Sequence, residues 1–544
     1  MFADPVQGDV FFDRRENLDL MKKRIDGFKK GYRQNVALLG QELVGKSSLL
    51  LQLIHELDSD NETLPIYLEV RPEPLHKFGK RFTGALLYYY FRKAGTHVPE
   101  KMDVLLEKAR DNLPRTTEAI LRVERLFGKR SRDQILSSLF DLLSILCEEG
   151  KKSCIMILDE FQELGSLNVR NPFTILGEKI MTQKESMYIV ASSSRRRAGE
   201  ILNHDLSLLF GSFEIDNLEP FGIDKGLEFI EKKLGGLPMS KTCMKFLVSI
   251  TNGHPFYLDS FCRATKRIVS EKGMKEASRS VVAEAISREV FSPRSITYQY
   301  LNDFLTHFMD NSTSQDLELL LAIADGNKKS SEISRIISRS TAQTARKLEK
   351  LVNSDVIVKR GKVYDFCDPL LKWWVRSVHR RRQETFEPVV EEKGELELRR
   401  QIEELMSLYV AQEKAGVEER LRNLFKLFRN EVVEIAGKTL RLPKFSNVSA
   451  RTVHGQELPV VASIGKIYWV ADFSKGVVSE NGVRAFLEKL SGFRGKISRK
   501  ILICLAGIET DAKLLAKEEG IWLWNLDDLN FILGLYEQPK MSCS

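Results

Sequence analysis

The sequence feature that most constrains the fold is a short apolar run followed by a glycine-rich loop and an apolar helical pattern, within residues 34–50. Residues 36–39 have the length and the β-branched start of a buried strand. Two glycines, a lysine and two serines follow in the loop: Gly40, Gly45, Lys46, Ser47 and Ser48. A strand, a G-x-x-x-x-G-K-S loop and a helix in this order are the pattern of a phosphate-binding loop.

Each residue type in this loop suits a role in holding phosphate. Glycines allow backbone N–H groups to turn inward around the β- and γ-phosphates, where a side chain would collide. Lys46 would place an ammonium against these phosphates, the Ser47 hydroxyl would hold Mg²⁺, and the helix that opens at Ser48 points its positive end at the same charge. We therefore predict a nucleotide-binding site that takes Mg²⁺; the alternative is a chance glycine-rich turn.

Length and composition describe a multidomain protein without membrane or disulfide signals. At 544 residues the chain exceeds what one hydrophobic core serves, and about three or four domains are expected. No apolar run approaches the roughly eighteen residues that cross a bilayer, the first residues lack a signal-peptide pattern, and the cysteines form no C-x-x-C pair. We therefore expect a cytoplasmic protein with no membrane partner. The net charge of +8 permits a nucleic-acid partner without arguing for one.

A second apolar strand, residues 153–158, ends in two adjacent carboxylates, Asp159 and Glu160. Beside a phosphate loop, the first acid can hold Mg²⁺ through its water shell, and the second can polarise the water that attacks the γ-phosphate. The alternative is a strand that ends in polar residues at the surface. We predict that Ser47 and Asp159 hold Mg²⁺ and that Glu160 and Lys46 are catalytic.

A third strand, residues 187–191, ends in three serines before the basic run 195–197. A polar side chain at this point can contact the γ-phosphate or the attacking water, and we expect Ser194 to act as such a sensor. The arginines can bind phosphate or form a solvated loop. Strands that alternate with helices predict a parallel sheet wrapped by helices, with the nucleotide at the C-terminal edge of the strands.

The order of these motifs resembles the archaeal-type P-loop ATPases, which lie near the AAA+ and STAND classes and are similar to origin-recognition ATPases. The resemblance rests on an early Phe-x-x-Arg, the phosphate loop, Leu-Asp-Glu, the polar strand end and a later Gly-His-Pro. It implies ATP as the nucleotide, with Phe11 and Arg14 near the base. It also implies that His254 and Pro255 line the nucleotide pocket from a helical lid. Judged from the residues alone, His254 can equally be a buried histidine at a helix start.

One position departs from this resemblance. Many relatives carry an arginine just before the last core strand, whereas here the stretch 208–212 ends in Ser212. No residue is then assigned as the positively charged side chain, or arginine finger, that would assist catalysis. We therefore expect hydrolysis to be slow or to depend on a partner.

The predicted fold class is α/β, with a P-loop NTPase core that contains a parallel sheet. The region after the core is expected to contain a helical lid, a winged-helix domain and a C-terminal α/β domain that resembles restriction endonucleases. The expected boundaries are 1–225 for the core, 226–300 for the lid, 301–385 for the winged helix, 386–395 for a linker and 396–544 for the last domain.

Three helices followed by a hairpin, within residues 315–364, have the order of a winged helix. The third helix, about 340–353, separates an apolar face from a basic one, which is the charge layout of a recognition helix. We predict that DNA is bound by eight polar residues of this region: Arg339, Gln343, Arg346, Lys347, Lys350, Lys359, Arg360 and Lys362. The alternatives are a solvated helix face and a winged helix that contacts only the ATPase core.

The last segment resembles the restriction-endonuclease-like domain that ends many of these ATPases. Active members carry an acid on one strand and an acid-x-lysine on the next, which together bind Mg²⁺. Here Pro459 lies near the first expected acid, and Lys475 comes one residue too late after Asp472 to share its face of the strand. We therefore expect a domain that binds nucleic acid or a partner without cleaving.

The sequence thus predicts an ATP-binding, ATP-hydrolysing protein whose nucleotide state changes the lid angle and, through it, the DNA-facing domains. Two alternatives remain open. One is a nucleotide-controlled switch or scaffold that assembles with a protein partner or as a homo-oligomer. The other is an ATP-regulated, Mg²⁺-dependent endonuclease.

Overall fold

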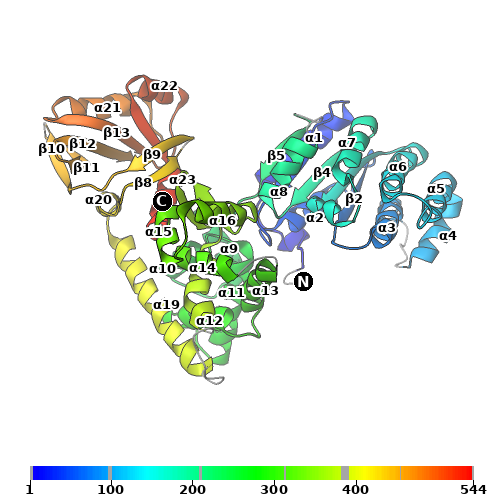
Figure 1. Cartoon of the computed structure of the whole chain (residues 1–544), viewed down its shortest axis with the longest axis horizontal. Coiled ribbons are helices and arrows are strands. Elements are labelled where there is room, and N and C mark those ends of the chain that lie inside the picture. The colour runs from blue at the N-terminus through cyan, green and yellow to red at the C-terminus, as the bar shows by residue number, and fades with distance from the viewer. Residues whose placement is uncertain are drawn as a thin grey trace. The chain divides into compact units, whose positions relative to one another are not determined.

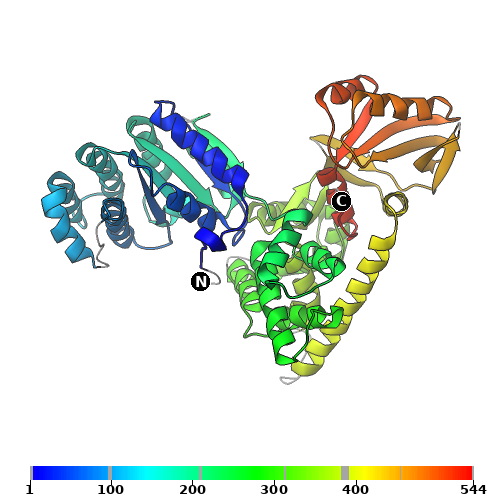
Figure 2. The ribbon, with the colours of Figure 1, turned by 180° about the vertical axis from the view of Figure 1, so that it is seen from behind.

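The computed structural model describes residues 4–95, 101–206, 211–310, 314–381, 391–435, 437–453 and 455–541. The chain divides into two compact units: Met1–Pro220 with Asn353–Asp355, and Phe221–Val352 with Val356–Ser544. Figure 1 and, from behind, Figure 2 trace the chain from the blue N-terminal elements to the red C-terminal ones. The domain boundaries predicted within the second unit stay predictions.

The first unit is built on a five-stranded sheet in the order β2-β3-β4-β1-β5, with every neighbouring pair parallel. The strands are β1 (Asn35–Leu39), β2 (Thr63–Glu69), β3 (Ser153–Asp159), β4 (Ser186–Ser192) and β5 (Phe213–Asn217). The apolar runs that predicted β1, β3 and β4 are continuous because helices cover both faces of a parallel sheet. The prediction of an α/β fold with a parallel sheet is confirmed.

Helices on each side of this sheet form two separate hydrophobic cores. Along β1, Val36 and Leu38 belong to one core, while Ala37 and Leu39 belong to the other, because successive side chains of a strand point to opposite faces. The helices of this unit are α1 (Arg15–Lys29), α2 (Lys46–Glu56), α3 (Leu75–Lys93), α4 (Met102–Asn112), α5 (Pro114–Glu124), α6 (Arg132–Gly150), α7 (Pro172–Thr182) and α8 (Arg195–Glu200).

The second unit begins with a run of helices and a hairpin. The helices are α9 (Ile223–Leu234), α10 (Lys241–Ile250), α11 (Pro255–Glu271), α12 (Arg279–Phe291), α13 (Ile296–Asp310), α14 (Ser314–Ala324), α15 (Ser330–Ile336), α16 (Thr341–Asn353) and α17 (Pro369–Trp374). Strands β6 (Ile357–Arg360) and β7 (Val363–Phe366) pair in antiparallel fashion after α16. Trp374 is fully buried, and its indole N–H donates to the Val290 carbonyl at 2.9 Å, so this tryptophan is a core residue.

The acidic segment expected as a linker is helical from Glu391 onward, where α19 (Glu391–Lys414) begins. This helix packs along α12, with Arg399 2.9 Å from Glu284. Residues 391–395 of the predicted linker therefore belong to the first turns of a helix, and the domain boundaries stay predictions. Residues 386–390 of the predicted linker lie outside the described residues.

The C-terminal part contains a mixed sheet in the order β10-β11-β12-β13-β14. The first three strands pair in antiparallel fashion and the last three in parallel fashion. Its elements, with a small hairpin before the sheet, are α20 (Val417–Lys426), β8 (Glu431–Ile435), β9 (Lys438–Leu442), β10 (Asn447–Val453), β11 (Gln456–Ile464), β12 (Ile467–Ser474), α21 (Glu480–Ser491), β13 (Lys496–Cys504), α22 (Thr510–Glu518), β14 (Ile521–Asn525) and α23 (Leu526–Leu535). Sequence analysis missed β8, β9 and β10 because none of them carries a continuous apolar run.

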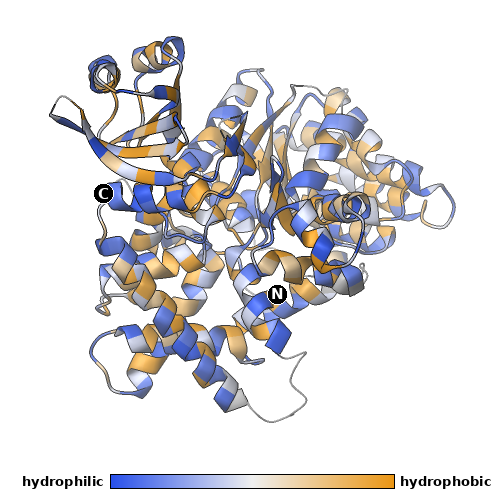
Figure 3. Ribbon diagram, turned by 60° about the vertical axis from the view of Figure 1, so that its left-hand side comes forward, coloured by the Kyte–Doolittle hydropathy of each residue, from blue (hydrophilic) through white to orange (hydrophobic). Residues whose placement is uncertain are grey.

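Hydrophobic residues gather on the strands of the two larger sheets and on the helix sides that pack against them (Figure 3). Within the described parts of the chain, every helix is too short or too polar to span a lipid bilayer.

Candidate nucleotide-binding site

The phosphate loop joins β1 to α2, and its two glycines are required for different reasons. Gly45 has φ +107°, a backbone conformation that only glycine adopts without strain. A Cβ atom on Gly40 would lie 2.7 Å from the carbonyl oxygen of Leu218, whose N–H donates to the Leu39 carbonyl at 2.7 Å. Gly40 is therefore needed where the chain leaving β5 crosses the loop.

Lys46 is the first residue of α2 and its side chain is only 4% exposed. Its ammonium donates to the carbonyls of Gly40 and Gln41, at 3.1 and 2.9 Å, and lies 3.7 Å from Glu160 Oε1. The positive charge is thus fixed inside the loop, on the side that faces the carboxylates of β3.

The structure brings the two predicted Mg²⁺ ligands into contact. Ser47 Oγ donates to Asp159 Oδ2 at 2.6 Å, and the Tyr67 hydroxyl from β2 donates to the same oxygen at 2.8 Å. Asp159 is 1% exposed, and burial, followed by the charge of Glu160, raises its pKa. A hydroxyl and a carboxylate are the hard oxygen ligands that fit Mg²⁺ in a site completed by substrate phosphates.

Tyr67 was not predicted as part of this site. Its burial and the adjacent Asp159 carboxylate raise the pKa of the phenol above its ordinary value, so the hydroxyl stays protonated and donates. In the sequence, Tyr67 is one residue of the mainly apolar stretch 65–70. Nothing in that stretch indicates that its hydroxyl contacts Asp159.

Glu160 follows β3 with φ +51°, a strained backbone conformation for a residue other than glycine. Its Oε2 accepts hydrogen bonds from the backbone N–H and the hydroxyl of Ser193, at 2.9 and 2.7 Å. Gln162 donates to the same oxygen at 2.6 Å. These donors hold the carboxylate in one orientation, which is what a group that positions water requires.

The serine that contacts Glu160 is Ser193, whereas the sensor was predicted at Ser194. The Ser194 hydroxyl donates to the Asp355 carboxylate at 2.8 Å within the same unit. Sequence analysis placed the polar end of β4 correctly, but three consecutive serines gave no way to choose the side chain that faces Glu160.

The N-terminal segment before α1 runs over the start of α2. The Val6 N–H donates to Ser48 Oγ at 3.1 Å, and Arg14 Nη2 donates to the Val44 carbonyl at 3.4 Å. Burial lowers the pKa of Arg14 to about 10, against the opposing charge of Asp13. Phe11 packs against the core that contains α1 and α2. Phe11 and Arg14 therefore belong to the same unit as the loop, and Arg14 touches it.

His254 and Pro255 lie in the second unit, at the start of α11. Pro255 is the first helical residue, where its missing N–H removes no helical hydrogen bond. His254 is 5% exposed, and its ring centroid lies 4.8 Å from that of Tyr257. Their role in nucleotide binding stays a prediction.

The basic run after β4 opens α8, and two of its three arginines have side-chain partners. Arg195 lies 2.8 Å from Glu219, and Arg197 lies 3.4 Å from Glu163. The position of the expected arginine falls partly outside the described residues, which omit 207–210. Ser212, just before β5, accepts a backbone hydrogen bond from Asn35 at 2.9 Å.

The eight residues predicted to bind DNA divide into two groups in the structure. Four are exposed along α16 and just before it: Arg339, Gln343, Arg346 and Lys350. Lys347, on the same helix, lies 3.3 Å from the buried carboxylate of Asp316. The other three, Lys359, Arg360 and Lys362, belong to the β6–β7 hairpin.

The hairpin is packed against the C-terminal part of the same unit. The Lys362 N–H donates to the Val432 carbonyl at 2.8 Å, and a Cβ on Gly361 would lie 2.6 Å from that carbonyl oxygen. The Arg360 guanidinium stacks 4.3 Å from the ring centre of Phe531, and Lys359 forms an ion pair with Glu349. Arg360 and Lys362 therefore lie against the C-terminal part, whereas Lys359 contacts α16 itself through Glu349.

The predicted acid of the C-terminal domain, Asp472, is 8% exposed on β12 and borders a pocket of about 430 Å³ with Glu457 and Pro459. A lysine that sequence analysis missed, Lys489 of α21, donates to Asp472 Oδ2 at 2.8 Å. Its distance of 17 residues from Asp472 along the chain hid this contact.

Comparison with known proteins agrees with this geometry. Residues 11–261 match the family described as an ATPase domain predominantly from Archaea. No curated protein matches the chain. The fold, the phosphate loop and this match define the class of the protein, which is a P-loop ATPase. More particularly, residues 11–261 are similar to ATPase domains of the archaeal type.

Solved structures with a similar arrangement are also P-loop ATPases. The Walker-type ATPase PABY2304 of Pyrococcus abyssi aligns over 69% of this chain and 100% of its own, with 17% identity and a TM-score of 0.50. The ORC2 protein of Aeropyrum pernix, solved as ADPNP–ADP complexes, aligns over 75% of this chain and 98% of its own, with 11% identity and a TM-score of 0.46. The first of these similarities supports the fold alone.

Proposed function

We propose that this protein is an AAA+/STAND-like ATPase that binds ATP with Mg²⁺, hydrolyses it, and couples its nucleotide state to DNA bound by the second unit. The observation that carries the proposal is the contact of Ser47 with Asp159 beside the buried Lys46, because a Mg²⁺–ATP site needs these three groups together. Phe11 and Arg14 would contact the base, and His254 and Pro255 would close the pocket from the lid.

Each side chain then has a defined role. Lys46 neutralises charge on the β- and γ-phosphates, while Ser47 and Asp159 are the residues that would hold Mg²⁺. Bound Mg²⁺ supplies further charge neutralisation on the same phosphates. Glu160, held by Ser193, accepts a hydrogen bond from the attacking water and orients it. Ser194 would respond to the γ-phosphate at the end of β4.

The DNA part of the proposal assigns α14, α15, α16 and the β6–β7 hairpin to a winged helix. Its support is the set of exposed basic and amide side chains on α16, of which Arg346 is one. Such groups bind backbone phosphates in a groove. Arg360 and Lys362 are left out of the proposed DNA surface, because the packing of Gly361 on Val432 occupies that end of the hairpin, and Lys359 is left out because its charge is paired with Glu349.

The test is ATP hydrolysis by the full chain with and without single-stranded, duplex and branched DNA. We expect DNA to bind and to accelerate hydrolysis, and Lys46→Ala to remove ATP binding while DNA binding remains. Tight ATP binding by Lys46→Ala would overturn the nucleotide site. A chain that oligomerises with ATP but neither binds DNA nor responds to it would instead be a nucleotide-controlled assembly switch. Homo-oligomers and protein partners stay predictions that sedimentation with and without ATP would test.

The contact of Lys489 with Asp472 favours a second candidate function, an ATP-regulated endonuclease. Lys489 brings a lysine to Asp472 from helix α21, whereas Lys475 follows the end of β12 and comes one residue too late along the chain. Our proposal remains a C-terminal domain of restriction-endonuclease-like fold that binds without cleaving. Mg²⁺-dependent cleavage of DNA that disappears in both Asp472→Ala and Lys489→Ala would establish the nuclease instead.

A further inference from the structure

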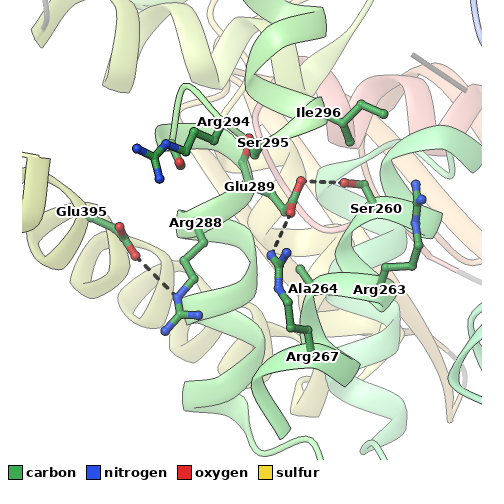
Figure 4. Close-up of a pocket in the computed structure, with 11 residues that line it drawn as sticks. Ser260, Arg263, Ala264, Arg267, Arg288, Glu289, Arg294, Ser295, Ile296 and Glu395 are labelled. Carbon is green, nitrogen blue, oxygen red and sulfur yellow. Dashed lines mark hydrogen bonds and ion pairs between the residues drawn. The ribbon is translucent and has the colours of Figure 1, made fainter. Parts of the chain in front are cut away.

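A polar cavity lies within the second unit. It encloses about 570 Å³ between α11, α12, the start of α13 and α19 (Figure 4). Four arginines and two glutamates provide its charges: Arg263, Arg267, Arg288, Arg294, Glu289 and Glu395. Four positive and two negative groups leave the lining with a net charge of +2, which favours an anion.

The charge of one arginine is already neutralised by the protein. All three nitrogens of the Arg288 guanidinium face carboxylates, with Glu284 at 2.7 Å, Glu271 at 3.1 Å and Glu395 at 3.9 Å. Arg288 therefore holds α12 and α19 together and has little capacity left for a ligand.

The buried carboxylate of Glu289 is also satisfied by the protein. It is 7% exposed and accepts hydrogen bonds from the hydroxyls of Ser260, at 2.7 Å, and Thr297, at 3.3 Å. Its other oxygen lies 3.5 Å from Arg267 Nη2, and this contact directs the Arg267 side chain into the cavity (Figure 4). Glu289 thus positions an arginine and leaves most donors of that arginine unused.

Three arginines retain donors for a ligand. A guanidinium carries five N–H groups, and Arg263 uses one nitrogen for Asp259 at 2.9 Å. Arg267 uses one nitrogen in its long contact with Glu289. Arg294, on the loop between α12 and α13, has no ion-pair partner among the residues that the structure describes. The side chains of Arg263 and Arg267 are 59% and 58% exposed, so an entering ligand can reach them.

The N-terminus of α13 adds backbone donors to the same cavity. Ile296, the first residue of this 15-residue helix, lines the cavity wall. The first N–H groups of a helix have no partner within the helix, and the helix dipole favours an anion beside them. In α13 the Tyr298 N–H already donates to Ser295 Oγ at 3.2 Å, so the N–H groups of Ile296 and Thr297 are the donors that remain. Two independent features, the arginines and this helix start, therefore select the same kind of ligand.

We propose that this cavity binds a compact ligand that carries two or more phosphate groups, held by Arg263, Arg267, Arg294 and the N-terminus of α13. Arginine forks match the geometry of phosphate oxygens. In Figure 4 the three guanidinium groups stand at separate points along the cavity, which suits several phosphates better than one. A volume of about 570 Å³ matches a small-molecule site, whereas a nucleic-acid duplex needs an open surface.

Calorimetric titration with pyrophosphate tests this site in the full chain carrying Lys46→Ala, so that the phosphate loop contributes little. We expect a single binding event whose affinity falls at least tenfold in Arg267→Gln with Arg294→Gln, and measurably in Arg294→Gln alone. Arg279→Gln is the matched control, because Arg279 is exposed at the start of α12 and about 13–20 Å along the helix from the cavity. This control should bind like its parent.

Thermal unfolding of each variant identifies a loss of binding that arises from misfolding. Arg294→Gln keeps the test valid if the double variant does not fold, because it changes an exposed loop side chain. No pyrophosphate binding to the parent, or equal affinity in the parent and Arg294→Gln, would overturn the proposal. Displacement of pyrophosphate by a short DNA duplex at matched phosphate concentration would also overturn it, in favour of a nucleic-acid site.

Discussion

Ser47 and Asp159 are 112 residues apart in the sequence, and their side-chain oxygens are 2.6 Å apart in the structure. The contact forms because β1 and β3 are parallel strands of one sheet, on either side of β4, so that their C-terminal ends reach the same edge. It places the two predicted Mg²⁺ ligands next to Lys46 and Glu160. The behaviour of these four residues provides the first tests of the site.

Replacing Asp159 with asparagine should separate stability from activity. Burial raises the pKa of Asp159 above its ordinary 3.8, so the folded state holds this proton more tightly than the unfolded state. The free energy of unfolding without nucleotide should therefore fall as pH rises from 3.8 through the raised pKa, and the loss persists at neutral pH. Asp159→Asn should remove this part of the pH dependence and raise the melting temperature of the nucleotide-free protein.

The same variant should lose Mg²⁺-dependent hydrolysis by about a hundredfold or more, because a metal ligand is gone. Differential scanning calorimetry across pH and a phosphate-release assay measure the two effects. Asp19→Asn, which changes an exposed carboxylate of α1, is the control and should leave both unchanged. An Asp159→Asn protein that hydrolyses ATP at the normal rate would contradict the metal assignment.

Glu160 and Ser193 should act as a pair in catalysis. Glu160→Gln should lower kcat by about 10²–10³-fold with little change in KM, because the residue acts on water and not on ATP binding. Ser193→Ala removes one of two hydrogen bonds that Ser193 makes to the carboxylate and should lower kcat by about tenfold. If Ser194→Ala reduces kcat more than Ser193→Ala does, Ser194 is the sensor as predicted from sequence.

Gly40→Ala should destabilise the first unit even without nucleotide. The added Cβ would meet the Leu218 carbonyl at 2.7 Å, and relieving that overlap should cost about 1–3 kcal/mol in the free energy of unfolding. Urea titration followed by circular dichroism measures this change. Gly199→Ala is the control, since a Cβ there would meet no atom within 4 Å and the position is helical, and it should leave stability unchanged or slightly raised.

Basic residues of α16 should matter more for DNA than those of the hairpin. Arg346→Ala with Lys350→Ala should weaken duplex binding and lower the slope of log affinity against log salt by about 0.9 for each DNA phosphate that is no longer neutralised. Arg360→Ala with Lys362→Ala removes the same charge from residues whose hairpin packs on the C-terminal part, and it should change the slope much less. Filter binding at several salt concentrations compares them. Equal slopes for both double variants would reject α16 as the DNA surface.

Local sequence patterns predicted the parts of the nucleotide site that lie next to one another along the chain. The loop from Gly40 to Lys46 follows its strand directly, and Asp159 with Glu160 ends another, so apolar runs and adjacent polar residues were sufficient. Patterns were insufficient where a contact joins distant segments. Tyr67 and Lys489 reach their carboxylates from other elements, and neither stands out among tyrosines and lysines in the sequence.

The sequence by itself determined that a phosphate loop, a strand ending in two acids and a basic helix exist, because each is a short-range pattern of polarity and backbone preference. Tertiary structure decided which of these groups act together. Parallel strand order put Ser47 against Asp159, the close crossing of Leu218 left no room for a side chain at Gly40, and the packing of Gly361 on Val432 placed the turn of the hairpin against the C-terminal part. Such pairings depend on how the chain closes on itself, and the polarity of a single segment does not encode that geometry.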